Sequence, residues 1–236
     1  MPKLSIIIPT RRLHAALAAR IRSRLAPLPD VEILIVEPDD IACPPSAIAG
    51  SPAPEMVLPA ASTRMLRATR GRGTQCNAGA RAASGELLLF LHDDTELPPD
   101  ALTCIGGVFE DPSVGAACFR LRFDHDHWLL GLYAACSRFE SVLTTFGDQG
   151  LVFRRDLFDQ LGGFPDWPLF EDVELARRAR RRSGIVKLPA TVTTSAIRFE
   201  RNGILRQQLL NAELLARFLL GARPQDLATR YECTRG

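Results

Sequence analysis

The sequence predicts an α/β fold with a largely parallel central sheet flanked by helices, and three observations predict it. Short apolar runs at 4–8 (LSIII), 31–36 (VEILIV) and 86–91 (ELLLFL) are typical of buried strands. Apolar residues at helical spacing fill 12–25, and a second helix is predicted at 74–84. Strands that alternate with helices in this way are typical of parallel sheets.

The second half of the chain continues with less regular elements. VGAACFRLRF is predicted to be a longer strand, and residues 128–146 form an apolar-rich predicted helix. A short strand, GLVFRR, and a strand region, IVKLPATVTTS, follow, with amphipathic helices predicted from about 203 to 231. No repeat or low-complexity tract divides the sequence, so we expect a single domain over 1–236.

Composition excludes several classes of protein. The 236 residues are 46% hydrophobic and 24% charged with a net charge of +2, an ordinary globular balance that by itself argues neither for nor against nucleic acid. We expect no nucleic-acid partner. None of the six cysteines forms a CxxC pair, so neither a zinc ribbon nor a thioredoxin-type site is indicated. The N-terminal apolar stretch is too short for a signal sequence, and no window approaches the roughly 20 apolar residues of a membrane helix. We therefore expect a cytoplasmic protein that is peripheral to a membrane at most.

Acidic residues follow two of the predicted strands. Asp93 and Asp94 stand in HDDT, directly after the strand at 86–91, and Glu37, Asp39 and Asp40 follow the strand at 31–36. Ligands bind beyond the carboxyl ends of parallel strands, so both groups are expected at one site. Adjacent carboxylates suit a hard divalent cation. The alternative is that Asp94 or Thr95 caps a following turn.

Two further stretches admit both a structural and a functional interpretation. FEDVELARRARRR places Glu171, Asp172 and Glu174 at a helix start and arginines at its end, which complements the helix dipole, with the arginines as a solvated face. Alternatively, one of these carboxylates acts as a general base. GRGTQCNAGARAASGE at 71–86 could hold phosphate or ribose oxygens at a helix start, although it is not a P-loop.

The histidine pair in FDHDHW is a weaker signal. His125 and His127 are two residues apart, so on a strand they would face the same side and could bind a metal. The alternative is a polar turn that leads into the helix predicted from Trp128.

The order of these stretches carries a resemblance to a known family. LSIIIPT, VEILIVE, GRGTQCNAGARAASGELLLFLHDDTELPPDAL, GDQGLVFRRDLFDQLGGFPDWPLFEDVELARRARRR and TTSAIRFERNG follow one another along the chain. In this order the sequence resembles the family 2 glycosyltransferases with the GT-A fold, and among them small bacterial stand-alone members. The resemblance covers about residues 3 to 231. It implies a nucleotide-binding half at about 1–112, an acceptor half at about 113–202 and C-terminal helices at about 203–231.

The resemblance also implies an activity and roles for particular residues. It implies an inverting transferase that uses a nucleotide-sugar donor and a divalent metal, Mg²⁺ or Mn²⁺. Asp94, with Asp93, would bind the metal at the diphosphate, while Asp172 would take the proton of the acceptor hydroxyl and Glu171 would position the acceptor or the base. Residues implied to contact the nucleotide or donor are Pro9, Thr10, Glu37, Asp39, Arg72, Gln75, Asn77, His92 and Asp93. Residues implied to lie near the donor sugar, the acceptor or the diphosphate are Asp148, Gln149, Arg198 and Arg201.

The sequence departs from the family pattern in the segment that reads the nucleobase. Arg11 and Arg12 follow PT where the family has other residues, and Glu37 in EPDDIACPP replaces an expected Asp, with the usual Gly-Ser turn absent. A UDP- or GDP-sugar is the expected donor, and the acceptor stays open, with a lipid-linked molecule among the options. Two alternatives remain: a nucleotidyltransferase on a similar scaffold, and a non-catalytic nucleotide- or sugar-binding protein.

The C-terminal stretch after residue 203 also has two interpretations. Its apolar stripe with arginine flanks could lie on a membrane surface, at the inner membrane near a lipid-linked acceptor. Alternatively, this stretch is a helix that packs on the core of the domain.

Overall fold

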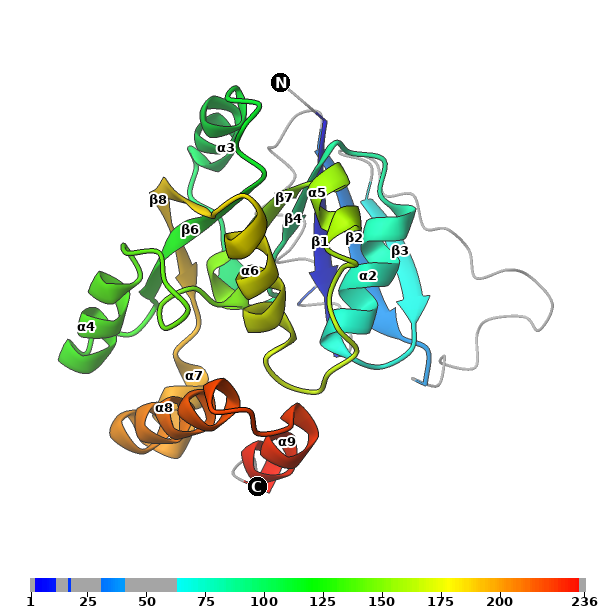
Figure 1. Ribbon diagram of the computed structural model, residues 1–236. Coiled ribbons are helices and arrows are strands. Elements are labelled where there is room, and N and C mark those ends of the chain that lie inside the picture. Colours follow the sequence, from blue (N-terminus) through cyan, green and yellow to red (C-terminus); the bar gives the residue numbers. More distant parts are fainter. Residues whose placement is uncertain (1–2, 12–16, 18–30, 41–62, 234–236) are drawn as a thin grey trace.

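The computed structural model describes residues 3–11, 17, 31–40 and 63–233 (Figure 1). The strands of these residues form one sheet in the order β3-β2-β1-β4-β7-β6-β8-β5, so the predicted α/β class is confirmed. The strands are β1 (Leu4–Pro9), β2 (Val31–Pro38), β3 (Thr63–Ala68), β4 (Leu87–Phe90), β5 (Thr95–Glu96), β6 (Ala116–Phe123), β7 (Leu151–Arg154) and β8 (Val186–Thr194). The predicted helix at 12–25 and the loop at 41–45 lie outside the described residues, apart from the buried Leu17.

The sheet is parallel on one side and mixed on the other. Strands β3, β2, β1 and β4 are parallel neighbours. Strand β7 is antiparallel to both β4 and β6, while β8 is parallel to β6 and antiparallel to β5. The carboxyl ends of β1, β2 and β4 therefore meet at one edge, where ligands bind in sheets of this kind.

Helices cover both faces of the sheet. They are α2 (Arg72–Ala82), α3 (Ala101–Phe109), α4 (Trp128–Cys136), α5 (Arg155–Gln160), α6 (Glu171–Arg182), α7 (Ile197–Asn202), α8 (Ile204–Leu219) and α9 (Pro224–Cys233), with a short 3-10 helix, η1 (Gly147–Gln149). Figure 1 shows α2, α5 and α6 on one face of the sheet. Strand side chains alternate between faces, so Ile7 packs with α2 and α6 while Ile6 and Ile8 pack with α3 on the other face.

The predicted helix at 128–146 is wrong in its length, because α4 ends at Cys136. Ser137 explains the end: its hydroxyl donates to the carbonyl of Ala134 and accepts the N–H of Leu121 at 2.9 Å. This bond ties the chain to β6, and residues 137–146 continue as turns. A hydroxyl that competes for backbone partners is a common cause of helix termination.

The C-terminal helices pack on the domain, as one of the two interpretations predicted. Leu214, Leu215 and Phe218 of α8 are buried against Val173 of α6 and Leu227 of α9. Within the described residues, no helix combines the length and the apolar composition needed to cross a membrane.

Gly79 shows how closely α2 packs on the sheet. A Cβ added there would lie 2.4 Å from Cγ2 of Ile7 and 3.2 Å from Cγ2 of Val36. We expect Gly79→Ala to lower the free energy of unfolding by about 1–3 kcal/mol in urea titrations, because the added methyl overpacks the core. Gly107→Ala in α3 is the matched control, since its Cβ would meet nothing within 4 Å. That variant should gain about 0.5–1 kcal/mol from helix propensity, and equal effects would contradict the close packing.

Candidate active site

The site begins where β1 and β2 end side by side. The N–H of Thr10 donates to the carbonyl of Val36 at 2.9 Å. The amide of Gln75 in α2 is buried and donates to the carbonyls of Thr10, at 2.8 Å, and Val36, at 2.7 Å. Gln75 was predicted to contact the nucleotide, and in the structure its amide N–H groups tie together the two strand ends at which a nucleotide would bind.

The acidic residues after β4 form the first part of the site. Burial and the neighbouring carboxylate of Asp93 raise the pKa of Asp94, and Arg198 and Arg72 oppose the rise. Burial, followed by the charges of Arg72 and Arg198, holds the pKa of His92 well below its usual range, so this imidazole is neutral. Thr95 does not cap a helix; its hydroxyl lies 3.1 Å from that of Thr194 and joins β5 to β8.

The first turn of α6 meets the loop before β7 at Gly147. Oδ2 of Asp172 accepts the N–H of Gly147 at 2.6 Å, and Oδ1 accepts the N–H of Val173 at 2.8 Å. A Cβ added to Gly147 would lie 2.8 Å from Oδ2 of Asp172 and 3.0 Å from Nε2 of His92. Gly147 therefore lets His92, after β4, and Asp172, at the start of α6, approach the same piece of backbone.

Two more carboxyl groups complete what we call the carboxylate cluster, which consists of Asp94, Asp148, Glu171 and Asp172. Burial, followed by the charges of Asp172 and Asp94, raises the pKa of Asp148 to about 7. Burial also raises the pKa of Glu171 to about 7, although Arg72 lies 3.5 Å away and opposes the rise. The charges of both Asp94 and Asp172 act on the carboxyl group of Asp148. The HDDT motif after β4 and the Glu171–Asp172 pair at the start of α6 are therefore both near Asp148.

Two arginines contribute positive charge to the cluster. Burial lowers the pKa of Arg72, but Glu171 and Asp172 raise it more, so its guanidinium stays charged. Arg198 of α7 hydrogen-bonds the hydroxyl of Tyr231 and lies over its ring at 5.6 Å, close enough to affect His92 and Asp94 electrostatically.

Other predicted site residues lie at the ends of β1 and β2 and on α7. Glu37 is buried at the end of β2, and Asp39 beyond it is exposed and donates its N–H to Ala68. Pro9 is buried at the end of β1. Arg201 on α7 is exposed to solvent.

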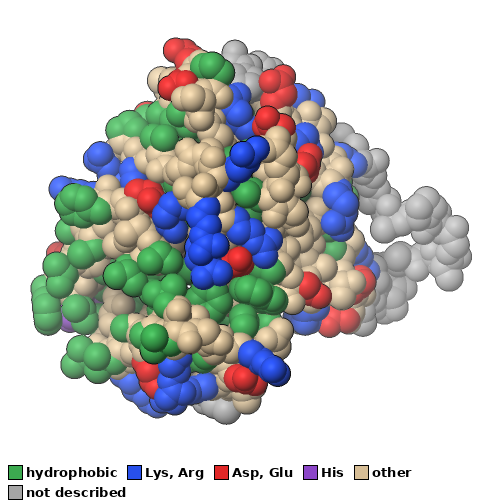
Figure 2. Space-filling model, viewed as in Figure 1, with side chains coloured by type: hydrophobic (Ala, Val, Ile, Leu, Met, Phe, Trp, Pro, Cys, Tyr) green, Lys and Arg blue, Asp and Glu red, His purple; other side chains and the backbone are tan. Residues whose placement is uncertain are grey.

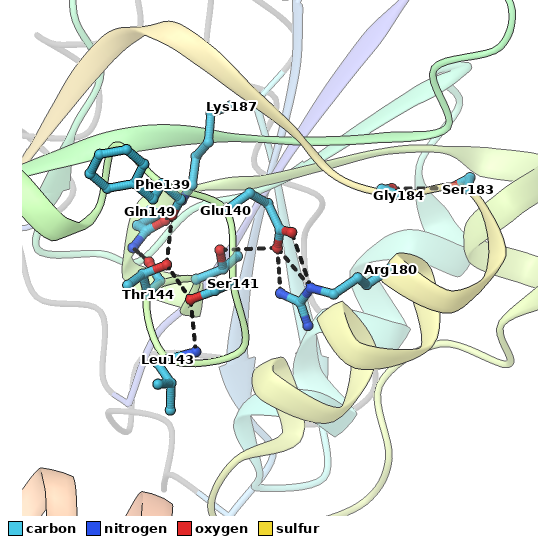
Figure 3. Close-up of polar contacts among 11 residues, drawn as sticks. Phe139, Glu140, Ser141, Leu143, Thr144, Gln149, Arg180, Ser183, Gly184 and Lys187 are labelled. Carbon is cyan, nitrogen blue, oxygen red and sulfur yellow. Dashed lines mark hydrogen bonds and ion pairs between the residues drawn. The ribbon is translucent and has the colours of Figure 1, made fainter.

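Asn77 and Gln149 already have protein partners. Asn77 exchanges two hydrogen bonds with the backbone of Phe164, at 2.8 and 2.9 Å. Gln149 is fully buried, donates to the carbonyl of Thr144 at 2.5 Å and accepts from Lys187 (Figure 3). Both side chains hold loops in place beside the site.

The remaining charged motifs have structural partners. His127 accepts the N–H of Leu129 at 3.2 Å and caps α4, as expected for a polar turn, while His125 lies 2.8 Å from Glu200. The arginines of α6 are only partly a solvated face: Arg181 and Arg182 are exposed, whereas Arg180 pairs with Glu140.

Tyr133 is a site residue that the sequence did not indicate. Burial, followed by the charges of Asp148 and Asp172, raises its pKa well above the usual range, and its ring stacks on that of Phe146, directly before Gly147 and Asp148, with 6.2 Å between the ring centroids. It lies in the apolar helix α4, where no neighbouring polar residue in the sequence indicates a functional site. Its place at the site depends entirely on how α4 packs.

Comparison with known proteins confirms the family resemblance and the fold. Residues 55–160 match the family model of glycosyl transferase family 2. The uncharacterized protein MT1568 of Mycobacterium tuberculosis (strain CDC 1551 / Oshkosh) is 29% identical over 245 residues, which cover 89% of this chain and 75% of that protein.

Two solved structures have a similar GT-A fold. The mannosyltransferase PcManGT from Pyrobaculum calidifontis, in complex with GDP-Man and Mn²⁺, aligns with a TM-score of 0.62 at 20% identity over 95% of this chain. S. aureus TarS 1-349 aligns with a TM-score of 0.61 at 16% identity over 83% of this chain. The chain spans 66% and 61% of the lengths of these two solved chains. Together the family match and the fold support a glycosyltransferase.

Proposed function

We propose that this chain is an inverting glycosyltransferase, because it matches glycosyl transferase family 2 over residues 55–160 and has the GT-A fold. It moves a sugar from a nucleotide-sugar donor to an acceptor hydroxyl. One observation carries the proposal: Asp94 from the end of β4 and Asp172 from the start of α6 both act on the pKa of Asp148. Carboxylates of different elements that perturb one another are typical of active sites.

Asp93 and Asp94 would hold the divalent metal, Mg²⁺ or Mn²⁺. No group of three His, Cys, Asp or Glu side chains suited to a metal ion occurs in the described part of the chain. Mg²⁺ is commonly held by one or two carboxylates together with substrate phosphates, so the pair fits a cation that shares its coordination with the donor. When bound, the metal neutralises charge on the leaving diphosphate. The raised pKa of Asp94 supports this fit, because a nearby cation would relieve its repulsion by Asp93.

The donor would bind along the edge where β1, β2 and β4 end. The charged guanidinium of Arg72, and that of Arg198 on α7, would attract the diphosphate by charge-assisted hydrogen bonds. Pro9, Thr10, Glu37 and Asp39 would contact the nucleoside. GDP-Man and UDP-GlcNAc occur in the solved relatives, which supports a GDP- or UDP-sugar as donor.

Asp172 would act as the general base. Its two hydrogen bonds to backbone N–H groups fix the carboxylate, and each oxygen keeps a second lone pair for the acceptor. It would take the hydroxyl proton while the acceptor oxygen bonds to the anomeric carbon and the bond from that carbon to the diphosphate breaks. Attack from the face opposite the leaving group inverts the anomeric centre. Glu171, held by Arg72, would position the base or the acceptor, and Asp148 would face the donor sugar.

Metal-dependent nucleotide binding tests this proposal. We expect Mn²⁺ with a UDP- or GDP-sugar to raise the melting temperature, by an amount equivalent to about 2.7 kcal/mol when ligand is at a hundredfold excess over Kd. The metal-dependent part should disappear in Asp94→Asn and persist in Asp100→Asn, an exposed acid just before α3. No metal-dependent binding of any common nucleotide would favour a non-catalytic role, and pyrophosphate released from a nucleoside triphosphate would identify a nucleotidyltransferase.

A further inference from the structure

Helix α4 exposes an apolar face that has no covering element among the described residues. Its sequence, WLLGLYAAC, contains no charged residue, and Leu130 is its one buried residue. Trp128 is 73% exposed and Leu132 55% exposed. Gly131, Ala135 and Cys136 are exposed on the same side, since residues three, four, seven and eight positions apart share a helix face. A helix face of this composition in contact with water usually marks an interaction site.

Neighbouring elements extend this face. Phe139 is 72% exposed and Leu143 59% exposed in the loop that follows α4, and Leu205 and Leu209 are each 62% exposed on α8, which contacts α4. Figure 2 shows hydrophobic side chains gathered along the edge of the molecule where α4 and α8 lie. We call the exposed side of α4, together with Phe139, Leu143, Leu205 and Leu209, the α4 surface.

The loop in this surface is anchored. Glu140 pairs with Arg180 of α6, and the hydroxyls of Ser141 and Thr144 lie 2.8 Å apart (Figure 3). Leu143 points away from these polar contacts, toward solvent. Polar contacts therefore anchor this loop while Phe139 and Leu143 stay exposed.

The charges around the α4 surface indicate what it contacts. Arg138 lies two residues after the end of α4, Arg201 lies near the end of α7, and Arg206 lies in the first turn of α8. All three are exposed and form no ion pair within the described residues. A second copy of the chain related by two-fold symmetry would bring these arginines toward one another, which disfavours a dimer through this face. Anionic lipid headgroups would instead match them, with the apolar side chains in the acyl boundary. An exposed Trp suits this interfacial position.

We propose that the α4 surface docks on a membrane that contains anionic lipid, with α4 and its following loop as the inserted elements. The C-terminal helix is thus a flank of the contact and not its centre. Tyr133 of α4 stacks on Phe146, which directly precedes Gly147 and Asp148, and the N–H of Gly147 donates to Asp172, so docking through α4 holds the carboxylate cluster close to the bilayer. This geometry suits an acceptor carried on a lipid, a consequence that rests on the proposed function.

Vesicle flotation of the full chain tests the docking without any sugar transfer. The chain should float with phosphatidylcholine vesicles that contain about one third phosphatidylglycerol, and bind phosphatidylcholine alone at least about fivefold more weakly. Trp128→Ser with Leu132→Ser should weaken binding at least tenfold, because burying either side chain in an apolar phase is strongly favourable. Arg138→Gln and Arg206→Gln should each weaken binding to the anionic vesicles about fivefold. Leu220→Ser is the matched control, an 88% exposed Leu at the far end of α8, and should bind as the wild type does.

Fluorescence places the contact on α4. The chain has two tryptophans, so in Trp167→Phe the emission reports on Trp128 alone. Brominated lipids should quench that emission. Unquenched emission, unchanged binding of the Trp128 and Leu132 double variant, or a wild-type dimer that this variant converts to a monomer would each overturn the proposal. Nucleotide binding measured on the same variants should be unchanged, which separates failure of docking from failure of the proposed function.

Discussion

Asp172→Asn should lower kcat for sugar transfer by about 10²–10⁴-fold, the usual contribution of a positioned general base. The amide of Asn cannot take the hydroxyl proton, whereas metal and donor binding at Asp94 should persist. Asn offers one acceptor oxygen in place of two, so either the Gly147 or the Val173 N–H loses its partner. That loss should lower the free energy of unfolding by about 1–3 kcal/mol, and the kinetics are to be measured well below the melting temperature of the variant.

Asp156→Asn is the matched control for Asp172→Asn. Asp156 is an exposed acid in the first turn of α5, so its replacement removes the same favourable interaction with a helix dipole but lies outside the cluster. Its kcat should stay within about twofold of wild type, since exposed substitutions away from special features have small effects. Should Asp172→Asn keep its rate while Glu171→Gln or Asp148→Asn loses it, the base is the other carboxylate and the assignment to Asp172 is wrong.

Much of the fold could be predicted because buried parallel strands consist of short continuous runs of apolar residues. LSIII and VEILIV lie within one or two residues of β1 and β2, and the strand at 86–91 became β4. The error at 128–146 has a non-local cause. Apolar composition continues past Cys136, but Ser137 finds its partner on β6, and sequence pattern does not report which strand lies beside it.

The site divides in the same way. The positions of Asp94 after β4 and Asp172 at the start of α6 could be predicted, because strand ends and helix starts are local features. The raised pKa values of Asp148 and Glu171 could not be predicted, since burial is the largest cause of each shift and burial depends on packing. The family resemblance implied that Gln75 contacts the nucleotide, yet its amide donates to strand carbonyls, because polar groups at a buried strand end need partners whatever the function.

A buried cluster of carboxyl groups lowers stability as it ionises, which gives the second large prediction. Burial and two neighbouring carboxylates raise the pKa of Asp148 from an ordinary 3.8 to about 7. Between those values the folded chain binds more protons at this group than the unfolded chain does, so stability falls as the pH rises through this window. The free energy of unfolding falls by as much as about 4 kcal/mol in total, at 1.36 kcal/mol per unit of pKa, and the fall is complete above about pH 7.

Asp148→Asn should therefore unfold at a higher urea concentration than the wild type at about pH 8, in buffer with a chelator, and the difference should shrink toward about pH 5. Glu171 ionises over the same range, so some pH dependence should remain in Asp148→Asn and fall further when Glu171→Gln is added. The control Asp156→Asn should follow the wild-type curve at every pH. If Asp148→Asn is no more stable than wild type above pH 7, the ionised carboxylate of Asp148 does not destabilise the folded chain beside Asp94 and Asp172. A stability gain that accompanies a loss of kcat is the expected result of charge repulsion retained for function.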